Sequence, residues 1–501
     1  MADSIPWFSN SFSVASALSS MMGMPLAEIT SEASSTAAEN NPLILAGVLL
    51  SLVVIYLASK VGGEICSRVN LPPVLGELIG GVTVGVSALH LLMFPEAGTA
   101  STPSLLTHFL QSTTGTSSAT AIAVAQGYSE VISILAELGV VILLFEIGLE
   151  SSLQELLRVG SQAVVVAVVG VAAPFTAGTL GLITLFGVPT IPAIFAGAAL
   201  TATSIGITAR VLAEIQRLSS REGQIIIGAA VLDDILGIIV LAVVASLAKT
   251  GEVEVTHIIY LVVSSVVFLV GSIILGRFFS PYFVALVNRL QTRGSLLLPS
   301  LVFAFVLSYI AAAIHLEAIL GAFTAGLVLA ETEKRQALEE QIIPIADMLV
   351  PVFFVCVGAK TDISVLNPFV PEHREGLIIA TFLIGVAIIG KVITGLTVFG
   401  QPNINRLAIG VGMIPRGEVG LVFAGIGAAS GILSRPLEAA IIVMVIFTTF
   451  LAPPLLRFAF KRSMLPEALG EPEAMTTSGS ESLTRITHLT ESEEAELHQE
   501  P

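Results

Sequence analysis

Charged residues are scarce in this 501-residue sequence, at 12% of the chain, which is about half the share typical of soluble domains. So few charges cannot cover the surface of a soluble protein of this length, which argues against a soluble enzyme or a nucleic-acid-binding protein. Aromatic residues reach only 6%, with a single Trp, and this disfavours a membrane β-barrel with aromatic girdles. The two cysteines, Cys66 and Cys356, cannot form a disulfide framework. No Gly-rich phosphate loop of the Walker type is present, which excludes a self-contained ATP-driven pump, and we expect no cofactor.

Apolar residues are abundant instead, at 54% of the sequence, and the mean hydropathy is +0.92. A membrane-spanning helix needs about 20 predominantly apolar residues. Thirteen segments approach this length, so the sequence predicts an all-α polytopic membrane protein with about thirteen transmembrane helices. They lie at residues 42–60, 72–92, 131–149, 161–187, 190–216, 222–248, 256–289, 297–313, 316–331, 342–360, 375–400, 404–431 and 436–460.

The basic residues indicate how these segments are oriented. If the N-terminus is outside and the C-terminus inside, fifteen Lys and Arg residues flank the segments on the cytoplasmic side and four on the outer side. This is the asymmetry that the positive-inside rule describes. The long loop 93–130 contains no Lys or Arg and fits the outer side. The net charge of −16 is largely a property of the end of the chain, because residues 463–501 hold nine Glu and one Arg.

The two ends of the chain are predicted to lie outside the membrane. Residues 1–41 lack Lys and Arg, so we do not interpret them as a secretory signal, which begins with a basic region. We interpret them as a polar N-terminal extension. Residues 462–501 are rich in Glu, Ser and Thr and poor in aromatic residues, which predicts a disordered acidic cytoplasmic tail.

A weak internal repeat relates the two halves of the sequence. The pattern VLG (74–76) followed by GV (81–82) resembles ILG (319–321) followed by GL (326–327), and FEIG (145–148) corresponds in position to VCVG (355–358). The first copy enters its helix from the inside and the second from the outside, which predicts inverted five-helix repeats, a signature of secondary transporters. The alternative is that Leu- and Gly-rich helices look alike by chance.

Five charged side chains lie in the middle of predicted membrane helices, where ionisable groups are costly and usually functional. Asp233 and Asp234 are adjacent and therefore point about 100° apart on a helix. Lys391 is the natural counter-ion for one of them, which leaves the other carboxylate to hold either a proton or a small cation. Exchange requires that the proton and the cation cannot occupy this carboxylate at the same time. The alternative is a static structural ion pair. The remaining two charges are Arg416 and Glu418.

Two of the predicted helices carry signals for a break. The first contains Thr201, Thr203 and Ser204, whose hydroxyls can replace backbone partners where a membrane helix unwinds. Na⁺ is a hard ion that prefers oxygen ligands, so these hydroxyls and Asp234 form a hypothetical Na⁺ site. The second contains Pro415 and Gly417, which together interrupt a helix. Breaks at corresponding positions of two repeats point to a transport site. The alternatives are small-residue packing around the hydroxyls and mutual neutralisation of Arg416 and Glu418.

Other ionisable residues are less informative. Glu77, Glu146, Glu150 and Glu317 lie near the ends of predicted helices, where snorkelling and the lining of an access funnel are both open interpretations. The histidines His90, His108, His257, His315 and His373 fall at the outer ends of predicted helices or in loops. They show no metal-ligand spacing, and we interpret them as interfacial.

Taken in order, several motifs resemble the monovalent cation/proton antiporter superfamily, in particular its second branch of bacterial sodium/proton antiporters. The resemblance covers residues 45–460, and each motif alone is weak. The motifs are LPPVLGEL (71–78), AELG (136–139), FEIGLE (145–150), TATSIGIT (201–208), LDDILG (232–237), HLEAILGAF (315–323), VG (357–358), GK (390–391) and PRGE (415–418).

The resemblance implies a homodimer in which each protomer has a scaffold domain, a core domain and two crossing broken helices. It implies that Asp234 binds the ion, that Asp233 pairs with Lys391, and that exchange is electrogenic, with two protons per Na⁺. The implied location is the plasma membrane or, for a cyanobacterial source, the thylakoid membrane. The expected layout is scaffold helices at 42–150 and 295–360, core transport helices at 160–250 and 375–461, and a linker helix at 255–290.

The sequence therefore favours a secondary transporter that exchanges Na⁺, with Li⁺ and K⁺ still open, for protons by alternating access. The alternatives are a cation channel and a K⁺/H⁺ exchanger without Na⁺ preference. An intramembrane aspartyl protease is disfavoured, because two neighbouring Asp residues on one helix cannot face each other as a dyad.

Overall fold

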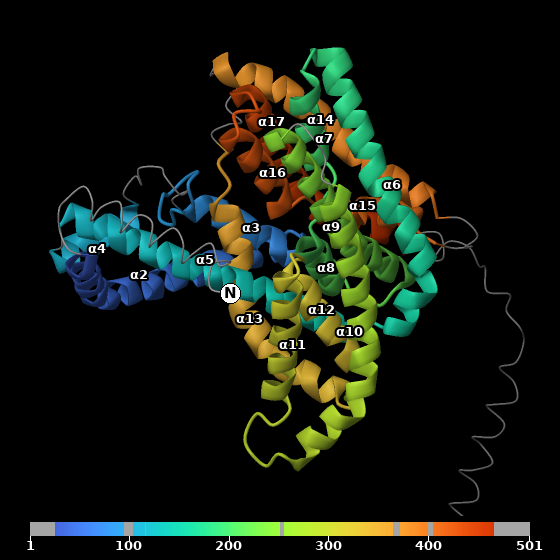
Figure 1. Cartoon of the computed structure of the whole chain (residues 1–501), viewed down its shortest axis with the longest axis horizontal. Coiled ribbons are helices and arrows are strands. Elements are labelled where there is room, and N and C mark those ends of the chain that lie inside the picture. Colours follow the sequence, from blue (N-terminus) through green and yellow to red (C-terminus); the bar gives the residue numbers. More distant parts are fainter. Residues whose placement is uncertain are drawn as a thin grey trace, which may run out of the picture. The chain divides into compact units, whose positions relative to one another are not determined.

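The computed structural model describes residues 26–94, 104–115, 117–250, 255–363, 371–398 and 404–464, and within them the chain forms sixteen helices and no strands (Figure 1). The predicted all-α class is therefore confirmed. The helices are α2 (Leu26–Arg68), α3 (Pro73–Val84), α4 (Leu105–Thr114), α5 (Ser118–Glu150), α6 (Leu153–Phe186), α7 (Thr190–Ala199), α8 (Ile205–Glu214), α9 (Arg221–Thr250), α10 (Val255–Arg289), α11 (Leu297–Ala313), α12 (Ala318–Ala330), α13 (Arg335–Ala359), α14 (Pro371–Leu396), α15 (Arg406–Gly412), α16 (Glu418–Ala429) and α17 (Arg435–Met464).

The chain divides into two units, Met1–Ala459 and Phe460–Pro501. The fold described below is that of the first unit. Of the second unit the structure describes only the end of α17, so the predicted acidic tail lies almost wholly outside the described residues. The first part of the predicted N-terminal extension, residues 1–25, lies outside them as well.

Each of the thirteen predicted apolar segments coincides with one helix or with a pair of helices. Among the described residues, eight helices are long and apolar enough to cross a membrane. They are α2, α5, α6, α9, α10, α13, α14 and α17. Four shorter apolar helices, α3, α7, α11 and α12, accompany them. The number of membrane crossings stays a prediction.

Some predicted boundaries differ from the observed ones. Helix α2 begins at Leu26, within the predicted polar extension, because the segment that follows is rich in Ala and Glu, which favour helix. The predicted loop 93–130 contains α4 and the first turns of α5. The Ser117 hydroxyl caps α5 by accepting the Thr120 N–H at 3.2 Å, so this helix starts well before its most apolar stretch.

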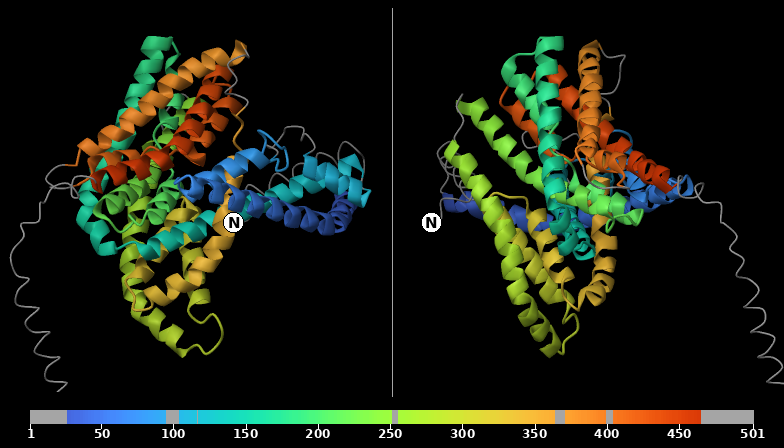
Figure 2. Two further views of the ribbon diagram at one scale, coloured as in Figure 1. Left: turned by 180° about the vertical axis from the view of Figure 1, so that it is seen from behind. Right: turned by 90° about the vertical axis from the view of Figure 1, so that its right-hand side faces the viewer.

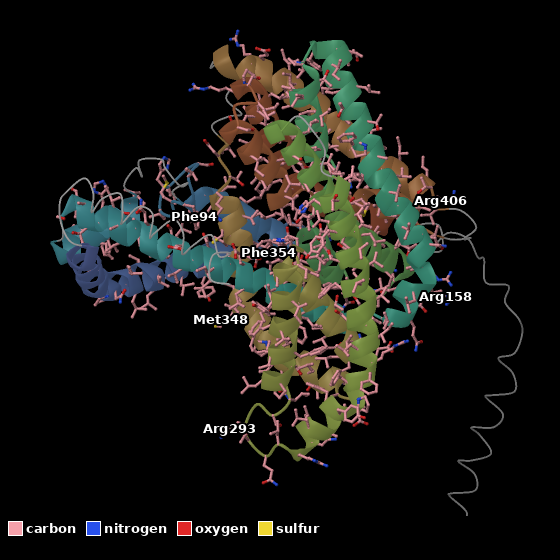
Figure 3. The ribbon with its side chains drawn as sticks, in the orientation of Figure 1. Phe94, Arg158, Arg293, Met348, Phe354 and Arg406 are labelled. Atoms are coloured by element: carbon pink, nitrogen blue, oxygen red, sulfur yellow. The ribbon has the colours of Figure 1, made fainter. Side chains whose placement is uncertain are left out.

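The helices of the first unit pack in two groups. One apolar cluster is surrounded by six helices, α6, α7, α9, α14, α16 and α17. We name these six helices the core group. Helices α2, α3, α5, α10, α11, α12 and α13 pack on one another, and we name them the scaffold group. Within the scaffold group, α2 and α5 lie side by side in Figure 1 and in the left view of Figure 2. Phe354 of α13, labelled in Figure 3, is fully buried.

Helices of the scaffold group cross at two pairs of glycines, and the internal repeat in the sequence relates one pair to the other. Gly81 of α3 meets Gly358 of α13, since a Cβ added at Gly81 would lie 2.9 Å from the Gly358 Cα atom. Gly326 of α12 meets Gly148 of α5 in the same way, again at 2.9 Å. The repeat equates Gly81 with Gly326 and Gly148 with Gly358, so one crossing maps onto the other. Small residues let membrane helices approach closely, and this explains why both copies keep glycine there.

Replacing either glycine of a crossing is expected to destabilise the protein. Gly81→Ala and Gly326→Ala should each lower the stability by about 2 kcal/mol, because the new Cβ meets a backbone carbonyl that cannot move aside. Thermal unfolding of the purified protein in detergent measures the effect. The matched control is Gly385→Ala in α14, where a Cβ would meet nothing within 4 Å. Equal melting temperatures for Gly81→Ala and Gly385→Ala would contradict the close approach of the two helices at Gly81.

Candidate ion-binding site

The two predicted breaks are present, and the two broken helices cross each other there. We name this region the crossing. Between α7 and α8 the chain leaves the helix at Thr201–Ser204, and between α15 and α16 it does so at Met413–Gly417. Three hydrogen bonds join the breaks. The Ser204 N–H donates to the Pro415 carbonyl at 2.8 Å, the Thr203 hydroxyl to Met413 at 3.1 Å, and the Thr208 hydroxyl to Gly412 at 2.9 Å. Hydroxyls from one broken helix thus satisfy carbonyls that unwinding frees in the other.

Arg416 lies in the second break and is fully buried. Its guanidinium donates to the Ala202 carbonyl at 2.9 Å and to the Leu200 carbonyl, just after the C-terminal end of α7. A helix C-terminus carries partial negative charge, so the guanidinium neutralises that end while it holds the two breaks together. Glu418 begins α16, but its side chain lies outside what the structure describes. Neutralisation of Arg416 by Glu418 therefore stays a prediction.

Asp233 and Lys391 form an ion pair between α9 and α14. The Lys391 Nζ lies 3.0 Å from Asp233 Oδ2, and both side chains are completely buried. Breaking such a pair would leave an uncompensated charge in a medium of low dielectric constant, so each partner holds the other in place. Within the described part of the chain, the second oxygen, Asp233 Oδ1, accepts no hydrogen bond.

Asp234 points elsewhere and lines a small cavity, with only 5% of its surface exposed. Thr203, Ser204 and Gly417 of the crossing line the same cavity, so the Asp234 carboxylate and two hydroxyl residues share one space. The opposite wall comes from the scaffold group, through Val140 of α5, Phe353 of α13 and the residues Glu317 and Ile319 at the start of α12. Asp234 thus lies at the boundary between the two helix groups.

Thr201 is arranged differently from the other hydroxyl residues. Its hydroxyl donates to the Ala198 carbonyl at 2.7 Å, which caps the end of α7, and it is not part of the cavity wall. Glu317, in contrast, is exposed beside the cavity although the sequence placed it only near a helix end. The HLEAILG motif was the available signal, but Glu317 lies more than eighty residues from Asp234 in the sequence, so nothing local showed that both line one cavity.

The donors suit a monovalent cation that is carried rather than a resident metal. In the described ranges no group of three or more His, Cys, Asp and Glu side chains could hold a metal ion. The Asp234 carboxylate and the neighbouring hydroxyls offer the hard oxygen ligands that fit Na⁺, and the carboxylate can hold a proton in its place. Glu317 adds a second carboxylate on the opposite wall of the cavity.

Two broken helices that cross at buried charges, with a carboxylate at the boundary between two helix groups, define an ion-coupled secondary transporter. Comparison with known proteins gives the family. The chain belongs to the transmembrane sodium/hydrogen exchanger family, whose pattern matches residues 48–462.

Individual relatives agree with this assignment. The high-affinity Na⁺/H⁺ antiporter NhaS3 of Synechocystis sp. is 68% identical over 448 residues, which cover 89% of this chain and 97% of NhaS3. The Na⁺/H⁺-K⁺ antiporter GerN of Bacillus cereus is 30% identical over 414 residues, 82% of this chain and 95% of GerN. The structure of the sodium proton antiporter MjNhaP1 from Methanocaldococcus jannaschii has a similar fold, with a TM-score of 0.55 at 17% identity, covering 85% of this chain and all of MjNhaP1.

Proposed function

We propose that this protein exchanges Na⁺ for H⁺ across a membrane and that Asp234 carries both ions in turn. The observation that supports this most directly is the placement of the two aspartates. Lys391 neutralises Asp233, whereas Asp234 lines the cavity between the core group and the scaffold group. The Na⁺/H⁺ exchange in the names of the relatives fits a carboxylate in that place.

Exchange follows from competition for one carboxylate. A proton on Asp234 removes the charge that attracts Na⁺, and bound Na⁺ keeps the proton away. Movement of the core group against the scaffold group then exposes Asp234 to the other side of the membrane, which is alternating access. Because the core group supplies α7 and α16 to the crossing and both helices of the ion pair, α9 and α14, the site moves as a unit.

The ion pair supplies a second proton in this proposal. Lys391 and Asp233 release one proton when Na⁺ is bound at Asp234 and take it up again when Na⁺ leaves, so two protons return for each Na⁺. One net charge then crosses per cycle and couples to the membrane potential at about 2.3 kcal/mol per 100 mV. The protein works as a homodimer with its N-terminus outside and its C-terminus in the cytoplasm, in the plasma membrane or the thylakoid membrane, and contributes to pH homeostasis.

The test uses everted membrane vesicles from cells that lack their own antiporters, with a pH-sensitive dye inside. Addition of Na⁺ to energised vesicles is expected to collapse the proton gradient between about pH 6 and about pH 9. Li⁺ and K⁺ in parallel samples set the selectivity, and K⁺ tests the alternative suggested by the name of GerN. Cation flux without proton movement would indicate a channel and contradict exchange.

A further inference from the structure

The cavity beside Asp234 has a carboxylate on each of two facing walls. Asp234 belongs to α9 of the core group, and Glu317 directly precedes α12 of the scaffold group. Only 5% of Asp234 is exposed, whereas Glu317 is an exposed residue. Asp234 therefore lies at the inner end of the cavity and Glu317 at its mouth.

The size of the cavity limits what can lie between the two carboxylates. Its volume is about 20 Å³, which is room for one water molecule or one small cation. Two ionised carboxylates that face one small space repel each other unless a cation or a proton lies between them. A Na⁺ ion in this space gains a second negative charge and a second hard oxygen ligand in addition to Asp234 and the hydroxyls of Thr203 and Ser204.

The start of α12 does not by itself account for a glutamate at this position. Glu317 is the N-cap residue of α12, where Ser, Thr, Asp and Asn are preferred because their short side chains cap the helix. Its side chain makes no capping hydrogen bond to α12. The partial positive charge of a helix N-terminus attracts an anionic side chain, but Asp would serve this purpose as well and would also cap the helix. What glutamate adds is a longer side chain beside the cavity.

The two carboxylates lie in the helix groups that move against each other in the proposed exchange. Helix α12 packs on α5 and α11 within the scaffold group, so Glu317 stays with that group. In the predicted orientation α12 begins at the outer side of the membrane. When the core group carries Asp234 toward the cytoplasmic side, Glu317 remains behind. The two residues therefore share one cavity only while the site faces the outer side.

We propose that Glu317 is a second cation-contacting residue, which binds Na⁺ together with Asp234 while the site faces the outer side of the membrane and loses the ion when the site faces the cytoplasm. This inference rests on the proposed exchange and adds a difference between the two faces. Outer Na⁺ meets two carboxylates, and cytoplasmic Na⁺ meets only Asp234. Loss of Glu317 therefore weakens the binding of Na⁺ at the outer face alone.

Kinetics at the two faces of the membrane test this difference. Right-side-out vesicles expose the outer face to the medium, and everted vesicles expose the cytoplasmic face. Glu317→Gln removes the charge and keeps the size of the side chain. We expect the KM for Na⁺ to rise about tenfold in right-side-out vesicles and to stay within about twofold of the wild type in everted vesicles, because only the outer-facing site loses an attracting charge. An unchanged KM at the outer face, or an equal rise at both faces, overturns the proposal.

Three further variants separate a cation ligand from a residue that only shapes the helix start. Glu317→Asp keeps the charge and should retain most of the outer affinity. Glu317→Ser supplies a preferred N-cap for α12 and should nevertheless raise the outer KM as Glu317→Gln does. The matched control is Glu130→Gln, which removes an exposed carboxylate of α5 that does not line the cavity and should leave both KM values unchanged. Wild-type kinetics in Glu317→Ser would mark a purely structural role and overturn the inference.

Binding of Na⁺ to the purified protein tests the second ligand without transport. Na⁺ should raise the melting temperature of the wild type in detergent, with choline at equal ionic strength as the reference, and should raise that of Glu317→Gln less. If vesicles show no exchange but this difference is present, the proposed function fails and the second ligand stands. If exchange is present but Glu317→Gln has the wild-type Na⁺ shift and the wild-type outer KM, the second ligand is refuted and exchange stands.

Discussion

Asp234→Asn is expected to abolish Na⁺-driven proton movement, with a fall in rate of about 100-fold or more. Asparagine has nearly the same shape, so the crossing and the cavity should remain intact. It supplies no negative charge for Na⁺ and no proton to release, and the whole exchange depends on that one group in this site. The measurement is the Na⁺-induced collapse of the proton gradient in everted vesicles, at protein levels matched to those of the wild type.

Two controls show whether the loss of exchange is due to the missing Asp234 carboxylate and not to lost charge elsewhere or to lost stability. Glu64→Gln removes a negative charge from an exposed position of α2 and should leave the rate unchanged. The melting temperature of Asp234→Asn in detergent should equal that of the wild type or exceed it, because a buried charge is removed. pH-dependent Na⁺ exchange in Asp234→Asn would show that another group carries the ions.

The positions of the helices could largely be predicted because their signals are local. Long apolar runs mark membrane helices in any fold, and Pro415 and Gly417 interrupt a helix wherever they occur. Thr203 and Ser204 indicated the first break through their hydroxyls. The ends of helices were less predictable, since α5 starts where Ser117 caps it and not where the apolar run begins.

The surroundings of the site could not be predicted because they depend on segments far apart in the sequence. Adjacent positions required Asp233 and Asp234 to point apart, but the two residues alone did not decide which of them meets Lys391. The family resemblance implied Asp233, and the structure pairs Lys391 with Asp233. Nothing in the sequence indicated that the Arg416 guanidinium donates to the Leu200 and Ala202 carbonyls, because these lie more than two hundred residues away, across the crossing.

The second large effect is expected for the Asp233–Lys391 pair. Lys391→Met leaves a buried carboxylate without its counter-ion and should lower the stability by about 3–5 kcal/mol. Asp233→Leu leaves a buried ammonium group and should cost a similar amount. The double variant Asp233→Leu/Lys391→Met replaces both charges by apolar groups and should recover most of the loss, since a buried ion pair can be exchanged for packed apolar residues at little net cost. Thermal unfolding in detergent measures all three. Additive losses in the double variant would mean that the two side chains do not stabilise each other.

The double variant also tests the second proton. Asp234 remains in its cavity, so Na⁺ should still exchange for the single proton that this carboxylate holds. Without the pair no second proton moves, and no net charge crosses the membrane. Transport in proteoliposomes should then stop responding to an imposed membrane potential, whereas the wild type gains about 2.3 kcal/mol per 100 mV for each cycle. A voltage response that persists in the double variant would assign the second proton to a different group, and the titratable side chains nearest to the cavity, beginning with Glu317, would then be the next to replace.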